Sequence, residues 1–427
     1  MRRHHATTAI SALALLALAA PLTANPQEPV SDATILATSL IGFEGNLKPT
    51  SFKEALAQGR HWVNQRLRAE NVDDATMGRT RDTTALTLRT VLGYESATYN
   101  GWSVMIEAED VSAVGDDSYD STLNGNTDRA VVADPDGTEV NRASLSYAGL
   151  ADTTFVLGRQ RIVLNNSRFV GNVGWRQNEQ TYDAYTVVNT AMEDLTLAGS
   201  YIYNINNVKA GDIGTAAIAL NAAYDVGEAG TLVGYYLELD NDSGAAALSS
   251  GTVGVSWDGR MPTGGNQFVY RVEFANQTDV GENPNTDLDA SYLNLEVGMD
   301  FDGTLVSIGS ETLEGTGVNG EQFQTPLATG HKFNGWADRF LATPQDGLED
   351  LYLSVGTEYA STNFKLAYHM FSADEGGTDF GTELDLLASR KLACGAVAGI
   401  KFADFSADSD GGMEDITKAW IWIAYSF

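Results

Sequence analysis

The chain has 427 residues, a formal net charge of −31, 43 glycines and one cysteine, Cys394. This acidity excludes a nucleic-acid partner, and a single cysteine excludes an intramolecular disulfide. A chain of this length normally forms two or three soluble domains, but no Pro-rich linker or change in composition divides it, so we expect one continuous architecture.

The first 24 residues have the pattern of a secretory signal peptide. Arg2 and Arg3 precede an apolar run over residues 9–20, and small residues lead to the expected cleavage site after Ala24. The apolar run is shorter than the roughly 20 residues that a membrane-spanning helix needs. We therefore expect residues 1–24 to be removed and the mature protein to leave the cytoplasm.

Residues 25–60 precede the first expected strand. Thr50 and Ser51 followed by Glu54 predict a short capped helix that ends at Gly59. We expect this segment to be either a periplasmic N-terminal piece or a piece at the inner mouth of a barrel.

From residue 61 to the end, short stretches alternate apolar and polar side chains with a period of two, which is typical of strands. In the stretch 290–301, Leu293, Leu295 and Val297 share one face, and Asn294 lies on the other. Each stretch approaches the roughly 9–11 residues of a tilted transmembrane strand. The pattern predicts an all-β fold, a transmembrane antiparallel up-and-down β-barrel over residues 61–427.

Counting these stretches gives 18 strands, an even number, and a count of 16 remains open. The expected strands are 61–70, 82–94, 100–111, 139–149, 153–163, 180–190, 194–206, 214–225, 230–240, 250–258, 266–276, 289–300, 303–312, 349–359, 361–371, 381–390, 394–404 and 415–427.

The connections between these strands alternate in length. Odd-to-even connections such as 112–138 and 313–348 are long, whereas even-to-odd connections such as 150–152 and 301–302 are short. Long extracellular loops and short periplasmic turns are the pattern of bacterial outer-membrane barrels.

The last strand ends on an aromatic residue, Phe427. Ile421, Ile423 and Tyr425 alternate on the same face up to the carboxyl terminus. The pattern resembles the C-terminal signal by which the barrel-assembly machinery recognises outer-membrane proteins. We expect the chain to lie in the bacterial outer membrane, with outer-membrane lipid and lipopolysaccharide around it.

Charged strand residues fall mostly on the face opposite the lipid, because a charge near the membrane midplane costs about 2–4 kcal/mol. The predicted pore-lining or substrate-binding residues are Arg66, Arg68, Arg89, Glu107, Glu109, Arg142, Arg159, Arg161, Arg168, Arg176, Asp183, Arg271, Glu273, Glu296, Lys365 and Lys401.

Arginine is unevenly distributed along the chain. Twelve arginines lie between Arg60 and Arg176, and four follow. One interpretation is an arginine side and a carboxylate side of the pore, which together give a transverse field. The other is a set of Arg–Glu pairs that neutralise each other and stiffen the wall.

The connection 164–179 combines cations, amides and aromatic rings, including Arg168, Phe169, Trp175 and Arg176. If it folds inward, it narrows the channel and offers bidentate arginine contacts to carboxylates. If it stays outside, it packs on neighbouring loops.

Several short runs resemble the alginate-export family of bacterial outer-membrane channels, and the resemblance covers nearly the whole mature chain. These runs are Arg66-Leu67-Arg68-Ala69-Glu70, Gly158-Arg159-Gln160-Arg161, Arg168-Phe169-Val170-Gly171, Trp175-Arg176-Gln177, Thr181-Tyr182-Asp183-Ala184 and His331-Lys332-Phe333-Asn334-Gly335-Trp336-Ala337-Asp338.

The resemblance implies an 18-stranded monomeric barrel whose arginine-lined conduit passes an anionic polysaccharide. The chain departs from that picture in its acidity, because the expected lumen also carries Glu107, Glu238, Glu273, Glu296, Glu358 and Glu383.

We therefore expect a porin-type channel, not an enzyme, for passive diffusion or export of hydrophilic, charged or saccharide solutes. A dedicated alginate-like exporter is the alternative within this class. A barrel hydrolase is the alternative of another class, with only His61, His331 and His369 available as a general base outside the signal region.

The sequence predicts no cofactor and no specific metal site. Neither the acidic run from Asp134 to Glu139 nor the run from Asp408 to Gly411 has the spacing of a calcium-binding loop.

Overall fold

The computed structural model describes residues 49–427 except 77, 80–81, 243–245, 282 and 285–286. The expected signal peptide and residues 25–48 lie outside the described part. None of the helices in that part is long and apolar enough to cross a membrane.

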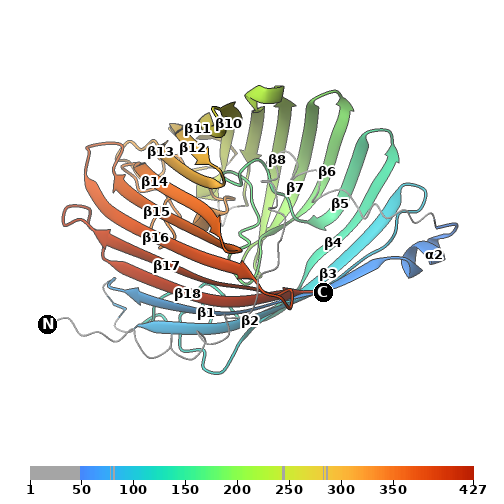
Figure 1. The fold of residues 1–427 in the computed structure, drawn as a ribbon, viewed down its shortest axis with the longest axis horizontal. Helices are drawn as coiled ribbons and strands as arrows, with labels where there is room; N and C mark the ends of the chain where they lie inside the picture. Colours follow the sequence, from blue (N-terminus) through green and yellow to red (C-terminus); the bar gives the residue numbers. More distant parts are fainter. Residues whose placement is uncertain (1–48, 77, 80–81, 243–245, 282, 285–286) are drawn as a thin grey trace.

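Eighteen antiparallel strands make up the sheet (Figure 1). They are β1 (Arg60–Asp74), β2 (Thr83–Glu95), β3 (Trp102–Ala113), β4 (Gly137–Leu150), β5 (Thr153–Gln160), β6 (Thr181–Met192), β7 (Leu195–Asn206), β8 (Asp212–Asp225), β9 (Thr231–Leu239), β10 (Ser250–Thr263), β11 (Asn266–Asp279), β12 (Asp289–Phe301), β13 (Thr304–Leu313), β14 (Leu348–Tyr359), β15 (Thr362–Ser372), β16 (Asp379–Lys391), β17 (Val397–Ala407) and β18 (Ile416–Ser426).

The sheet closes into a ring because β18 pairs with β1 as well as with β17. The closing register runs from Asn64 opposite Ser426 to Asp74 opposite Ile416. Every other strand pairs with its two neighbours in sequence, so no strand edge is left unpaired. The expected barrel is confirmed, and its strand number is 18.

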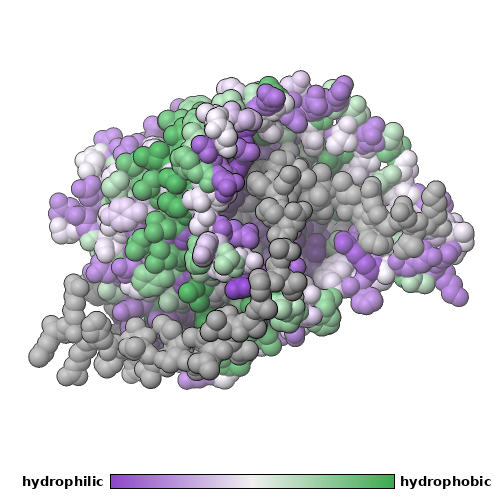
Figure 2. Space-filling model, viewed as in Figure 1, coloured by the Kyte–Doolittle hydropathy of each residue, from purple (hydrophilic) through white to green (hydrophobic). Residues whose placement is uncertain are grey.

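The two faces of the strands differ as the alternation predicts. On β12, Leu293, Leu295 and Val297 are exposed on the outer face, whereas Tyr292 and Asn294 are buried inside. Figure 2 shows hydrophobic side chains gathered over the outer surface of part of the wall. An apolar outer band and a polar interior are the arrangement that a lipid bilayer requires.

The terminal strand follows the same rule. Ile423, Tyr425 and Phe427 are exposed on the outer face, whereas Lys418 and Trp420 are buried in the lumen. The predicted parity of this strand is confirmed.

The connections alternate between long and short around the ring. The β3–β4 loop (114–136), the β5–β6 loop (161–180) and the β13–β14 loop (314–347) lie at one end. Turns of two residues lie at the other end, as at Asp302 and Gly303, whose positive φ angles of 52° and 89° fit a tight hairpin turn. The lengths therefore distinguish the two ends as predicted.

One short helix, α2 (Phe52–Ala57), precedes β1. Ser51 is its N-cap and accepts a hydrogen bond from the backbone N–H of Glu54, as the sequence predicts. Tyr94 of β2 donates to the carbonyl of Leu56, and Ala97 N–H donates to the carbonyl of Ala55. These contacts hold α2 against the short-turn rim of the barrel. Three single-turn 3-10 helices also lie in the described part of the chain, at Gly227–Ala229, Ala246–Leu248 and Gly330–Lys332.

Candidate functional site

The candidate site is the barrel lumen, and the β5–β6 loop crosses it. Arg176 of this loop binds Glu70 on β1 at 3.2 Å, and Arg168 binds Glu311 on β13 at 2.9 Å. In a ring of 18 strands, β13 lies eight strands from β5 in one direction and ten in the other. The loop therefore folds inward and reaches the opposite wall, which is the first of the two placements that the sequence left open.

The β13–β14 loop enters the lumen from the other side and meets the β5–β6 loop. Gly171 N–H donates to the carbonyl of Leu327 at 2.9 Å, and Thr329 N–H donates to the carbonyl of Ser167 at 3.0 Å. We call these two loops the inward loops.

The inward loops also share an apolar core with the barrel wall. Phe169 contacts the rings of Tyr235 on β9, Tyr292 on β12 and Phe323 of the other loop, with centroids 5.2–5.9 Å apart. The inner faces of β8 and β9 supply the remaining wall with Ala217, Ala219, Val233, Leu237 and Leu239. Apolar burial of this kind fixes the loops more firmly than polar contacts alone would.

Most lumen arginines are paired with carboxylates. These pairs are Arg68–Asp134, Arg68–Glu70, Arg89–Glu109, Arg142–Glu107, Arg161–Glu179, Arg168–Glu311, Arg176–Glu70, Arg176–Asp338 and Arg271–Glu273. Buried charges need such partners because an isolated charge is costly to remove from water. The interpretation of neutralising pairs is therefore realised along much of the wall.

A transverse division of charge exists beside these pairs. β1, β17, β18 and the β5–β6 loop contribute Arg66, Arg68, Arg176, Lys401 and Lys418 to the interior. β12 to β16 contribute Glu296, Glu311, Asp350, Glu383 and Asp385. Glu70 on β1 and Lys365 on β15 interrupt this division, so the transverse field stays a prediction.

Three lumen cations make no ion pair with a carboxylate among the described residues, and all three were predicted. Arg66 donates to Gln177 at 2.9 Å and to backbone carbonyls of the β5–β6 loop. Lys401 is buried, and its ammonium lies 2.7 Å from Nε2 of His331. Lys365 on β15 is exposed, with its ammonium 5.7 Å from the ring of Trp336.

A group of tryptophans surrounds Lys401. Its ammonium lies 3.8 Å from the ring of Trp336, 4.3 Å from that of Trp175 and 5.5 Å from that of Trp420. Trp175 also stacks on His331 with centroids 5.1 Å apart. Cation–π contacts strengthen when they are desolvated, so these rings partly replace the hydration of the ammonium.

His331 and Asp338 link this aromatic group to the ion pairs. Nδ1 of His331 lies 2.6 Å from one oxygen of Asp338, whose other oxygen accepts from Lys418 at 2.8 Å and from Arg176 at 3.1 Å. Burial lowers the pKa of His331 to about 3, although Asp338 acts in the opposite direction. The imidazole is therefore neutral at neutral pH.

Glu179 links the two ends of the β5–β6 loop to each other and to β4. Arg161 binds it through two contacts of 2.5 and 2.8 Å, and Asn141 on β4 donates to it at 2.7 Å. Burial alone would raise the pKa of Glu179, but the charge of Arg161 outweighs it and the pKa falls to about 2.

Two predicted pore residues lie on the other face of the wall. Arg159 and Asp183 pair at 2.8 Å on the same strand faces as Leu157 and Tyr185, which are exposed on the outer surface. The alternation continues through this point, since Val156 and Gln160 are buried on the inner face of β5 and Tyr182 and Ala184 on that of β6. The predicted lumen position is wrong for these two residues.

Glu238 also differs from its expected position. It lies with Tyr236 on the outer face of β9, where the Tyr236 hydroxyl donates to it at 2.5 Å. The inner face of β9 carries Val233, Tyr235 and Leu237 instead, since that face is covered by the inward loops.

Two other predicted residues, Glu273 and Glu296, lie on the lumen face and bind neighbouring strands. Tyr235 donates to Glu273 at 2.9 Å, and Tyr352 donates to Glu296 at 2.8 Å. Glu273 is fully buried, whereas Glu296 is half-buried. We expect Glu296 to be the more accessible of the two to a solute.

The sequence prediction missed several residues of the interior, namely Asp134, Glu179, Glu311, Asp338 and Asp350. Asp134 was considered only as part of a calcium loop, but its carboxylate binds Arg68 and the backbone N–H of Gln177. Asp134, Glu179 and Asp338 lie in loops, where the alternation of faces gives no signal, whereas Glu311 and Asp350 lie on the alternating lumen faces of β13 and β14.

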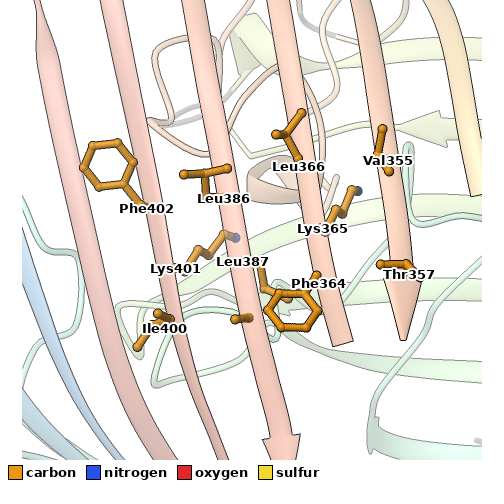
Figure 3. Close-up of a pocket in the computed structure, with 11 residues that line it drawn as sticks. Val355, Thr357, Phe364, Lys365, Leu366, Leu386, Leu387, Ile400, Lys401 and Phe402 are labelled. Atoms are coloured by element: carbon orange, nitrogen blue, oxygen red, sulfur yellow. The ribbon is translucent and has the colours of Figure 1, made fainter. Parts of the chain in front are cut away.

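An apolar depression lies on the wall, and its lining also includes Lys365 and Lys401 of the lumen site (Figure 3). Its lining comes from β14 to β17 and includes Phe364, Leu366, Leu386 and Ile400, all exposed on the outer face. An apolar depression on this face suits lipid, not a hydrophilic solute.

Comparisons with known proteins place the chain in a family. Residues 57–306 match the alginate export family. No curated protein matches the chain.

Solved structures of bacterial channels share the fold. OccAB4 of Acinetobacter baumannii superposes with a TM-score of 0.69 at 12% identity, covering 87% of this chain and 98% of its own. OpdK of Pseudomonas aeruginosa with vanillate gives a TM-score of 0.69 at 11% identity. OccK9 (OpdG) of the same organism gives a TM-score of 0.68 at 13% identity. Each of these two comparisons covers 87% of this chain and 99% of the other chain. The closed barrel of 18 strands and the match over more than half of its residues show that the chain belongs to the alginate export family.

Proposed function

We propose that the protein is a bacterial outer-membrane channel that passes hydrophilic solutes carrying carboxylates, including saccharide acids. The barrel supplies the passage through the membrane, and the inward loops narrow it so that a solute must contact their side chains. The family, together with a signal-like N-terminus and a terminal aromatic strand, supports the outer-membrane location.

The observation that carries this proposal is the set of lumen cations that lack a carboxylate partner among the described residues. Lys401 lies next to the rings of Trp175 and Trp336, and Lys365 lies 5.7 Å from the ring of Trp336, whereas Arg66 donates to the backbone carbonyl of Trp175. A solute carboxylate would gain a charge-assisted hydrogen bond from Lys365, the exposed cation of the three.

Two kinds of solute fit this chemistry. The family supports an alginate-like polyuronate, and the presence of vanillate in the OpdK structure supports a small aromatic carboxylate. The acidity of the chain, with Glu296 and Asp258 also in the lumen, favours solutes that follow the cationic side of the pore.

Flux through proteoliposomes tests the proposal. We expect the protein to pass sodium glucuronate faster than uncharged glucose of similar size, and Lys365→Gln to reduce the glucuronate flux about two- to fivefold while leaving glucose unchanged, since one ion pair in water is worth about 1 kcal/mol. Lys53→Gln, on the exposed surface of α2, is the matched control. Equal flux of both solutes, or the same loss in the control, would contradict the proposal.

We also propose that the protein is not a hydrolase. His331 accepts from Lys401 through Nε2, and His369 is held by Asp350 at 2.9 Å through Nδ1 with Asp385 3.8 Å from Nε2. Among the described residues, neither imidazole forms a hydrogen bond with a Ser or Thr hydroxyl, the pairing that activates a nucleophile. Hydrolysis of lipid or peptide by the purified protein would refute this.

The exposed Phe427 and the apolar outer face suit recognition by the barrel-assembly machinery and contact with lipid and lipopolysaccharide. We expect Phe427→Ser to reduce the folded fraction in the outer membrane, as measured by heat-modifiable electrophoretic mobility.

A further inference from the structure

We propose that the lumen contains a carboxylate-binding site which Asp338 of the β13–β14 loop occupies in this arrangement, and from which a solute carboxylate displaces it. The inference rests on the proposed function and adds to it a way in which the solute opens its own path.

Three donors from three separate elements surround the Asp338 carboxylate. Lys418 of β18 and Arg176 of the β5–β6 loop bind one oxygen at 2.8 and 3.1 Å, and His331 binds the other at 2.6 Å. The side chain of Asp338 is almost fully buried. Such a convergence of donors on both oxygens is how proteins bind carboxylate ligands.

His331 is oriented to donate to a carboxylate at this place. The Asp338 carboxylate can only accept, so Nδ1 of His331 carries the hydrogen and Nε2 accepts from Lys401. A neutral imidazole in this tautomer donates to Asp338, and it would donate equally to the carboxylate of a solute.

Asp338 balances the cations of a connected set of ion pairs. The set joins Arg68, Arg176 and Lys418 to Glu70, Asp134 and Asp338, and Lys401 adjoins it through His331 while Asp385 acts on Lys401 from β16. If Asp338 left without replacement, three cations would face two carboxylates, and Lys418 would keep no ion pair among the described residues. An uncompensated buried charge is strongly unfavourable, so departure of Asp338 requires the entry of another anion.

The segment that carries Asp338 is held by contacts and not by regular structure. Asn334, Gly335 and Asp338 all have positive φ angles, of 51°, 82° and 62°. The backbone N–H groups of Trp336 and Ala337 donate to Asp385 and Glu383 of β16. Residues with such φ angles keep them only while their surroundings hold them, so loss of the Asp338 contacts favours a change of conformation.

The exposed Lys365 provides the approach to this site. Its ammonium lies 5.7 Å from the ring of Trp336, which in turn lies 3.8 Å from the ammonium of Lys401. Figure 3 shows Lys365 and Lys401 on β15 and β17, either side of β16. A carboxylate that first meets Lys365 would therefore have the next cation, beside His331, within reach.

Conductance in planar bilayers tests the inference. With the full-length protein in potassium chloride, we expect sodium glucuronate to raise the mean open conductance of the wild type, and glucose to leave it unchanged. The Asp338→Asn channel should be open without glucuronate. Its conductance response to glucuronate should be about tenfold smaller than that of the wild type, since hydrogen bonds to charged groups are worth about 1.5–3 kcal/mol and 1.4 kcal/mol corresponds to tenfold. Glu321→Gln is the matched control, because Glu321 lies in the same loop and its carboxylate accepts only from Thr316 among the described residues.

A second variant separates the binding site from a loss of folding. Lys418→Gln should also raise the basal conductance, but it should weaken the glucuronate response because a donor of the site is lost. Heat-modifiable mobility verifies that each variant forms the barrel.

The outcomes distinguish this inference from the proposed function. A wild type that passes glucuronate while Asp338→Asn keeps the wild-type basal conductance and response would overturn the displacement site alone. A wild type that passes no glucuronate would overturn both. An effect of Glu321→Gln equal to that of Asp338→Asn would show that any charge in the loop suffices, and would also overturn the specific site.

Discussion

Replacement of Arg168 by methionine should release both inward loops from each other and from the far wall. The guanidinium of Arg168 binds Glu311 of β13 at 2.9 Å and Asn334 of the β13–β14 loop at 2.8 Å, and it lies 4.8 Å from the ring of Phe333. The side chain is 3% exposed. Methionine keeps much of the apolar stem but removes every polar contact.

The expected magnitude follows from the charge that remains. Removing one partner of a buried ion pair costs about 3–5 kcal/mol. Glu311 keeps hydrogen bonds from Tyr292 and Asn334, both at 2.5 Å, so we expect the lower end, about 3 kcal/mol, for the free energy of loop opening. That corresponds to an opening equilibrium about 150-fold larger.

Hydrogen exchange of the detergent-solubilised barrel measures this directly. We expect amides of residues 161–180 and 314–347 to exchange about 10²-fold faster in Arg168→Met, with the amides of β1 to β18 unchanged, and the single-channel conductance to rise. Arg260→Met is the control, because the Arg260–Asp300 pair is 38% exposed on its arginine side and such pairs are worth about 0–1 kcal/mol. Unchanged exchange in both loops would refute the role of Arg168 as the link across the lumen.

Further predictions concern acid, packing and metal. Docking lowers the pKa of His331 from 6.5 to about 3 and that of Glu179 from 4.5 to about 2, so an opened loop binds protons that the docked loop does not. Docking of the loops should therefore be complete above about pH 6.5 and weaken as His331 titrates between pH 6.5 and 3. It should weaken further as Glu179 titrates between pH 4.5 and 2. Exchange rates of the two loops against pH check this, and a profile unchanged by His331→Gln would contradict it. Gly93→Ala should destabilise the barrel by about 1–3 kcal/mol, because a Cβ there would lie 2.0 Å from the ring of Trp62. Gly356→Ala is the control, because a Cβ at that position meets open space. Equal melting temperatures of the two variants, measured by heat-modifiable mobility, would contradict this prediction. Because the Asp134 carboxylate already binds Arg68 and the backbone N–H of Gln177, EDTA should leave the thermal unfolding midpoint unchanged. A lower midpoint in EDTA would indicate a bound metal ion and contradict this prediction.

The barrel could be predicted from the sequence because its constraint is local. A strand between lipid and a polar lumen must alternate, so Leu293, Asn294 and Leu295 reveal their faces without reference to the rest of the chain. The same parity placed Lys418 and Trp420 inside.

The prediction failed where a charged side chain was taken as a sign of the lumen face. Arg159 and Asp183 share the outer faces of Leu157 and Tyr185 and neutralise each other in an ion pair. At Glu238 the inner face of β9 is apolar, so both faces of the strand look alike and the charge misleads.

The arrangement of the lumen could not be predicted because it depends on contacts between distant residues. Arg168 and Asn334 are 166 positions apart, and Arg176 and Asp338 are 162 apart. Either inward loop alone could pack outside the barrel. Only their joint apolar core and shared ion pairs with β1, β13 and β18 determine the inward arrangement.

The reversal potential of the wild-type channel in a planar bilayer, measured across a tenfold gradient of potassium chloride, tests the central claim most directly. If unpaired lumen cations select carboxylate solutes, the potential should show anion preference, and it should move toward zero in Lys365→Gln. A clear cation preference in the wild type would contradict a channel for anionic solutes.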